Sequence, residues 1–237
     1  MFSEDKKVLL DKAKRFFQDK IVASHANKTK ELKHLKVFSP NPFLDKYLAN
    51  FAFGSCDYKS IAKALIYPRA LGTSINTIFG SQMQFFCKDV LNGFASVVPG
   101  IDIEFVDQVD GRHKYCQIKA GPNTINKDDI DTILNHFRAI RNLAKTNGLK
   151  EFNPDLDCVV GVFYGDDSDL SGMYKAIKKV HPVFVGQEFW LRLTGDKAFY
   201  SELIDKIAEA VEDVDGTAVI EDAINCLAEE LEARDMR

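Results

Sequence analysis

The 237-residue sequence has no long uninterrupted hydrophobic segment. No run approaches the eighteen or so apolar residues that a membrane-spanning helix needs. The first residues, 1–7, are largely polar and have no apolar core behind them. We therefore expect neither a transmembrane helix nor a signal peptide.

Cysteine is also scarce, and its arrangement argues against disulfides and zinc. The five cysteines are an odd number, lie far apart and form no Cys-x-x-Cys pair. This usage favours free thiols in a reducing cytoplasm. A phosphate-cradling glycine-rich loop and a dinucleotide-binding fingerprint are absent as well, which disfavours a nucleotide-driven enzyme.

Charge is divided unevenly along the chain, although the net charge is only −4. Residues 1–150 hold 23 Lys and Arg against 15 Asp and Glu, which is +8, whereas residues 151–237 hold 8 against 20, which is −12. A basic N-terminal part can present a positive surface to phosphates. The same division would also arise if charged residues of one sign cluster on particular helices and no nucleic acid is bound.

Hydrophobic periodicity predicts an α/β protein with a mixed sheet flanked by helices and a helical N-terminal region. We expect a single domain, residues 1–237, with a mainly helical part (1–95), a hairpin and core sheet (96–195) and C-terminal helices (196–237). The predicted helices cover 4–21 with a lysine-rich continuation over 28–36, 42–66, 74–91, 126–148, 199–214 and 217–233, with an interruption at Pro68-Arg69; the predicted strands lie within 101–120, 158–164 and 183–185.

The segment 101–120 is predicted to form a β-hairpin around an Asp110-Gly111 turn, because Asp-Gly between alternating apolar runs is a strong hairpin signal. A two-residue turn pairs Glu104 with Gln117 and Asp102 with Lys119. Side chains alternate along a strand, so these four share one face of the hairpin. Apolar side chains occupy the other face, which is the predicted core face.

The polar face of this hairpin has the composition of a metal site beside a phosphodiester. Two carboxylates, Asp102 and Glu104, suit Mg²⁺, which prefers oxygen ligands and keeps waters and substrate phosphate in its shell. Gln117 offers an amide oxygen, and the backbone carbonyl of Ile118 can complete the protein ligands. Lys119 can orient the attacking water and offset charge on the phosphate.

Two other interpretations of this segment remain open. A surface hairpin with charges on its solvent side explains the same pattern without chemistry. Strand alternation places Asp107 with Lys114 on the face opposite Asp102 and Glu104. If a β-bulge changes that alternation, Asp107 becomes an alternative to them as the first acid of the site. On the preceding helix, Gln84 is an auxiliary candidate and Asp89 a weaker one.

The turn and helix after the hairpin hold candidates for DNA contact. Asn123, Thr124 and Asn126 are amide and hydroxyl side chains of the kind that reads base edges, although turn formation and helix capping explain them equally. Lys127, Arg138 and Arg141 can contact phosphates, which positions a protein on DNA without reading its sequence. His136 is expected to have a surface or packing role.

The hairpin residues, Asp-x-Glu followed by Gln117-Ile118-Lys119, resemble the signature of PD-(D/E)XK nucleases, with Gln117 in place of the usual acid. A wider resemblance, over about residues 40–214, is to type II restriction endonucleases that cut interrupted palindromes with a GG-N-CC core. The segments that carry it are Asn41-Pro42-Phe43, 64–80, Asp110-Gly111-Arg112, Lys119-Ala120-Gly121, 159–165 and 186–190.

This resemblance implies a restriction-endonuclease-like sheet and a Mg²⁺-dependent homodimer that cleaves duplex DNA. It further implies a prokaryotic cytoplasmic enzyme paired with a DNA methyltransferase of the same specificity. The departure at Gln117 keeps two alternatives open, namely a DNA-binding module of the same fold without catalysis and a structure-specific repair nuclease. Asp102 and Glu104 both remain candidates for the family's first acid.

Overall fold

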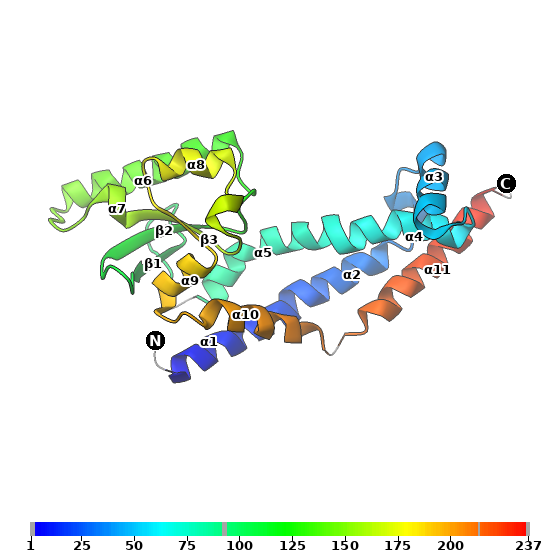
Figure 1. The fold of residues 1–237 in the computed structure, drawn as a ribbon, viewed down its shortest axis with the longest axis horizontal. Helices are drawn as coiled ribbons and strands as arrows, with labels where there is room; N and C mark the ends of the chain where they lie inside the picture. Colours follow the sequence, from blue (N-terminus) through cyan, green and yellow to red (C-terminus); the bar gives the residue numbers. More distant parts are fainter. Residues whose placement is uncertain (1–2, 92–93, 213, 236–237) are drawn as a thin grey trace. The chain divides into compact units, whose positions relative to one another are not determined.

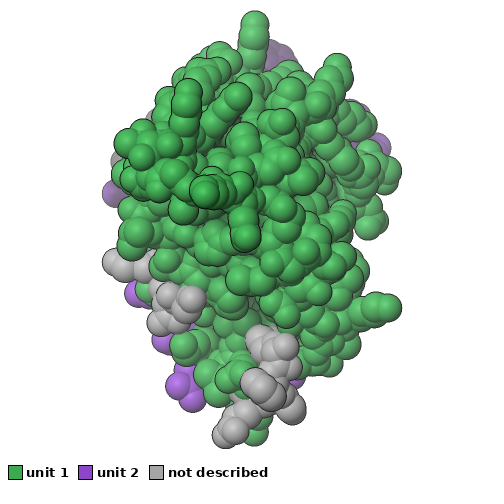
Figure 2. All heavy atoms as spheres, turned by 90° about the vertical axis from the view of Figure 1, so that its left-hand side faces the viewer, with its two compact units in different colours: residues 1–13, 83–207 green, residues 14–82, 208–237 purple. Residues whose placement is uncertain are grey.

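The computed structural model describes residues 3–91, 94–212 and 214–235. The chain forms two compact units (Figure 1). Unit 1 contains residues 1–13 and 83–207, and unit 2 contains residues 14–82 and 208–237; Figure 2 colours them separately. Nowhere in these described ranges is a helix both long and apolar enough to cross a bilayer.

Unit 2 is helical. Its core is built from aliphatic side chains such as Ile61, Ile66, Ile224 and Leu227, which are at least 93% buried. The C-terminal helix packs within this unit, against the helices of residues 23–31 and 58–68. The elements lying in or entering this unit are α1 (Ser3–Phe16), η1 (Phe17–Val22), α2 (Ala23–Glu31), η2 (Leu35–Val37), α3 (Pro42–Phe53), α4 (Tyr58–Pro68), η3 (Arg69–Ser74), α5 (Ile75–Asp89), η6 (Glu209–Val211) and α11 (Gly216–Asp235).

The predicted interruption at Pro68-Arg69 is wrong, because α4 continues through a π-helical segment into α5. Proline has no N–H to donate, and its ring clashes with the carbonyl four residues earlier in a regular helix. A wider π-helical segment, η3, directly follows Pro68, so the helix continues instead of ending there. Arg69 further fastens the segment by donating to the carbonyl of Val37 at 2.9 Å.

Unit 1 contains the predicted mixed sheet, which confirms the α/β fold class. Its four strands lie in the order β1-β2-β3-β4, with β1 antiparallel to β2 and the other neighbours parallel. The buried runs at 158–164 and 183–185 are strands, as predicted. The strand bounds are β1 (Ile103–Val106), β2 (His113–Lys119), β3 (Cys158–Val162) and β4 (Val183–Val185).

Helices cover both faces of this sheet (Figure 1). Helices α6 (Lys127–Thr146) and α8 (Gly172–Lys178) pack on one face through Phe137 and Tyr174, among others. On the other face lie α9 (Gln187–Thr194) and α10 (Phe199–Ala208), which contact each other through the rings of Trp190 and Phe199, with centroids 5.4 Å apart. Two short elements, α7 (Pro154–Asp157) and η5 (Asp167–Asp169), complete the unit.

The hairpin forms, but its predicted register is wrong by two residues. Glu104 pairs with Tyr115 rather than Gln117, and the same register carried one step further places Asp102 opposite Gln117. The turn is longer than predicted because Asp107 N–H donates to the carbonyl of Arg112 at 2.9 Å, which leaves residues 108–111 as the loop. A two-residue type I′ turn needs positive φ at both central residues, and within the described residues only glycines have it.

Candidate active site

The polar face of the hairpin is a covered face and not a solvent face. A two-residue shift preserves parity, so Asp102, Glu104, Gln117 and Lys119 still share one side. Gln117 and Lys119 pair with the buried residues Val160 and Val162 of the neighbouring strand, whose side chains pack beneath α6. The site therefore lies between the sheet and α6.

Asp102 is a partly buried carboxylate. Its Oδ2 accepts a hydrogen bond from the backbone N–H of Ile118 at 2.6 Å. Burial raises the pKa of Asp102, while the Ile118 N–H and the charge of Lys119 oppose that rise. A cation that approaches this carboxylate stabilises its ionised form.

Gln117 lies opposite Asp102 and is only 7% exposed. Its Nε2 donates to the carbonyl of Gly100 and to Nδ1 of His136, which extends from α6. Gly100 has φ +81°, and a Cβ there would come within 2.5 Å of the His136 ring. The close packing of these three residues fixes the amide, and its buried Oε1 has no hydrogen-bond partner among the described residues.

Lys119 is the cation of the site. It ends β2, and its Nζ lies 3.8 Å from Oδ1 of Asp129 on α6, with 27% of its side chain exposed. An ion pair this long and this accessible contributes little to stability. Its ammonium group is therefore available to a ligand that reaches the exposed end of the strand.

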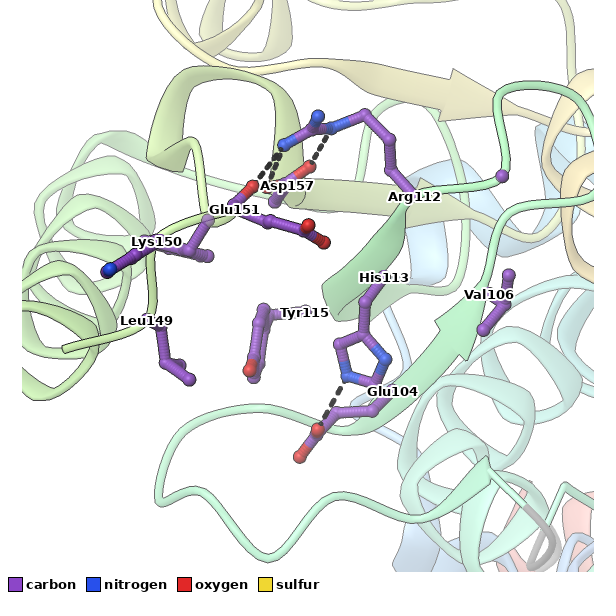
Figure 3. A pocket seen from close by; sticks show the side chains of 11 residues that line it. Glu104, Val106, Arg112, His113, Tyr115, Leu149, Lys150, Glu151 and Asp157 are labelled. Atoms are coloured by element: carbon purple, nitrogen blue, oxygen red, sulfur yellow. Dashed lines mark hydrogen bonds and ion pairs between the residues drawn. The ribbon is translucent and has the colours of Figure 1, made fainter. Parts of the chain in front are cut away.

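Glu104 lies on the same face but has other partners. Its two carboxylate oxygens accept from Ser96 Oγ at 2.6 Å and from His113 Nε2 at 2.9 Å (Figure 3). It lines a pocket of ≈ 860 Å³ together with Tyr115 and Arg112, whereas Asp102, Gln117 and Lys119 do not line it. Glu104 and Asp102 therefore share a face of the hairpin but engage different partners.

Asp107 belongs to a buried ion network on the core face, as its parity predicts. It is fully buried, accepts from Arg192 Nη1 at 2.8 Å and lies 3.9 Å from Nζ of Lys114, which is 1% exposed. The same lysine lies 2.7 Å from Asp110 and 3.8 Å from Asp157, which also binds Arg112. With Glu188, which pairs with Arg192 at 3.0 Å, four carboxylates and three cations interact here, so Asp107 is held away from Asp102 and Lys119.

The residues around Asp102 fit a hard divalent cation. Gln117, whose buried Oε1 has no partner among the described residues, lies opposite the partly buried Asp102 on the neighbouring strand, and both side chains carry oxygen donors of the kind that Mg²⁺ prefers. No group of three His, Cys, Asp or Glu side chains converges as a metal site in the described ranges.

The six candidate DNA-contacting residues are all exposed, and two of them also have a local structural role. The six are Asn123, Thr124, Asn126, Lys127, Arg138 and Arg141. Asn126 caps α6 in a reciprocal capping box with Asp129, as predicted. The Oγ1 of Thr124 donates to the carbonyl of Gly121 at 2.8 Å. The side chain of Gln84, the auxiliary candidate on α5, lies outside the described part of the chain, and Asp89 is exposed.

His136 and Asp129 are the two site residues that the sequence reasoning missed. Both lie on the α6 face that meets the sheet, at a spacing of seven residues and in line with the buried Ile133 and Ile140. Polar residues inside an otherwise apolar helical stripe are the signal that identifies them. His136 was expected to have a surface or packing role, and the structure places its ring against Gln117.

A four-stranded mixed sheet flanked by helices is consistent with the restriction-endonuclease-like α/β fold. The family model for the type II restriction endonuclease EcoO109I matches residues 10–215, and the chain belongs to this family of DNA-cleaving hydrolases. EcoO109I itself recognises an interrupted GG-N-CC-type site, and type II enzymes generally need a divalent metal. A search of curated proteins finds no match.

Proposed function

We propose that the protein is a Mg²⁺-dependent homodimeric endonuclease that hydrolyses both strands of duplex DNA at a short palindromic or interrupted-palindromic site. The buried, unpartnered Oε1 of Gln117 opposite Asp102, in a chain of this family, carries the proposal. Water attacks phosphorus and the 3′-oxygen leaves, which gives a 3′-hydroxyl and a 5′-phosphate. The enzyme works beside a prokaryotic DNA methyltransferase that protects the same site.

Each residue of the site has a proposed role. Asp102, the amide oxygen of Gln117 and the backbone carbonyl of Ile118 hold the cation, and Glu104 is the second acid of the face. The cation, when bound, polarises the phosphate and stabilises its developing charge. Lys119 holds the attacking water and offsets the negative charge of the transition state. His136 and Gly100 keep the amide of Gln117 in place by accepting from its Nε2.

Cleavage of a panel of plasmids tests this function. The parent protein should give discrete fragments in Mg²⁺ and none in chelator, and sequencing the fragment ends reports site, symmetry and overhang together. Cutting without a fixed sequence would indicate a structure-specific repair nuclease instead. Equal binding to duplex DNA in Mg²⁺ and chelator, with no strand breaks, would indicate a binding module.

Thermal unfolding with and without Mg²⁺ distinguishes the two acids. A ligand that binds only the folded protein stabilises it by about 1.4 kcal/mol at ten times its dissociation constant. We expect Mg²⁺ to raise the free energy of unfolding of the parent by this amount and to leave that of Asp102→Asn unchanged. The reason is that the Asp102 carboxylate is partly removed from water, so a bound cation stabilises its charge. Glu104→Gln is the matched variant, since both oxygens of Glu104 already have partners.

The same measurement in chelator gives a second readout. Burial raises the pKa of Asp102, so the ionised side chain is less stable in the folded protein than in the unfolded chain. Asp102→Asn should therefore melt at or above the temperature of the parent when metal is absent. An equal Mg²⁺ gain in the parent and in Asp102→Asn would remove Asp102 from the proposed ligands.

A further inference from the structure

Helix α3 presents its apolar side chains outward. Phe43, Tyr47 and Phe51 recur every four residues along one face and are 87%, 60% and 77% exposed. Leu44 and Leu48 lie beside them and are about half exposed. Ala49 is the buried residue of the helix. Single exposed hydrophobic residues are common on proteins, but a contiguous row of this kind marks an interaction surface.

The row lies on a capped helix that packs against α4 of the same unit. Asn41 caps the helix through hydrogen bonds from the N–H groups of Phe43 and Leu44, and Pro42 occupies its first turn. The rings of Tyr47 and Phe51 stack at 5.9 Å with an interplanar angle of 21°. The surface is therefore a preformed one, which lowers the entropy lost when a partner binds.

The charges of the helix decide the class of partner. Asp45 and Lys46 are its charged residues, so α3 has no net charge. Nucleic acid and anionic membranes attract surfaces rich in lysine and arginine, which α3 is not. An apolar, aromatic surface without net charge matches the core of a protein–protein interface.

We propose that α3 binds a second copy of this chain, with the two α3 helices antiparallel about a two-fold axis at Tyr47. This inference rests on the proposed function, because a palindrome is read by a two-fold symmetric protein. The spacing of the row is self-complementary, since a two-fold axis at Tyr47 places Phe43 against Phe51 of the second copy. Antiparallel helices also oppose their dipoles favourably.

The buried area is adequate for such a dimer. Large aromatic side chains cover about 150–250 Å² each, so the five exposed side chains offer roughly 500–600 Å² per copy. Two copies then bury roughly 1,100 Å² in total, which clears the approximate 1,000 Å² expected of a biological interface. The aromatic residues are the anchors that usually dominate binding energy.

Sedimentation of the parent and of two charge variants, without DNA or metal, tests this interface. The parent should be a dimer, and Phe43→Lys and Phe51→Glu should each raise the dissociation constant at least about a hundredfold, because each change recurs twice in a symmetric dimer. Mixing the two variants should restore dimers, since position 43 of one copy then meets the opposite charge at position 51 of the other. Val180→Glu, at a half-exposed valine in unit 1, is the matched control.

Each outcome decides for or against the antiparallel α3 dimer. A monomeric parent, or a Phe51→Glu variant that stays dimeric with native circular dichroism, would overturn it. Failure of the mixture to re-form dimers would overturn the antiparallel pairing, which alone brings positions 43 and 51 together. These results do not depend on catalysis, so a dimeric parent that cuts no DNA would refute the nuclease and leave the interface standing.

Discussion

Replacing Lys119 with alanine is expected to lower the rate of DNA cleavage at least about a hundredfold, the usual loss when a group that stabilises transition-state charge is removed. The folded protein should be unaffected. The Nζ of Lys119 is 3.8 Å from its carboxylate partner, Asp129, and both side chains are partly exposed. Such an ion pair contributes between nothing and about 1 kcal/mol to stability.

Single-turnover cleavage of a plasmid that carries the site is the measurement, with thermal unfolding alongside it. Lys175→Ala changes an exposed lysine on α8 and is the matched control, expected to cut at the parental rate. DNA binding by Lys119→Ala should persist, because the lysine is proposed to act on the transition state. Cleavage within about threefold of the parent would remove Lys119 from the chemistry proposed here.

Replacing Asp107 with alanine is expected to destabilise the fold by about 3–5 kcal/mol, the range found when one partner of a buried ion pair is removed. Without Asp107, the positive charges of Arg192 and Lys114 lose the fully buried carboxylate that both of them face. It also removes the acceptor for the N–H of Val109 at 2.8 Å, which shapes the hairpin loop.

Equilibrium unfolding in urea measures this change, and Asp131→Ala, at an exposed aspartate on α6, provides the control. At temperatures where the variant is still folded, cleavage per folded molecule should be close to that of the parent. An Asp107→Ala protein as stable as the parent, yet unable to cut, would reverse the assignment and make Asp107 the acid of the site.

Strand alternation predicted the faces of the hairpin, whereas the register needed information from distant residues. Asp102, Glu104, Gln117 and Lys119 share a face because side chains alternate, and a two-residue shift leaves that unchanged. The shift itself accompanies the burial of Asp107 and Lys114. Arg192, which pairs with Asp107, lies 85 residues beyond it, and no local pattern in the hairpin predicts that contact.

The ends of α6 were predicted from the sequence, whereas the role of two polar residues in its buried stripe was not. Its start at the Asn126 cap and its end near Gly148 follow from short-range rules, and both were predicted. Asp129 and His136 lie within its buried stripe, where polar residues need partners. Which partners they find, Lys119 and Gln117, depends on how the helix packs on the sheet, and that is set by the whole core.

Neither compact unit is a continuous stretch of chain. Unit 1 combines residues 1–13 with 83–207, and Lys6 joins the two stretches through ion pairs to Asp196 and Glu202 at 2.6 and 2.8 Å. During synthesis, the opening helix must therefore wait for nearly two hundred further residues before its partners emerge. A ribosome stalled before Asp196 would hold a unit 1 in which Lys6 still lacks both of its ion-pair partners.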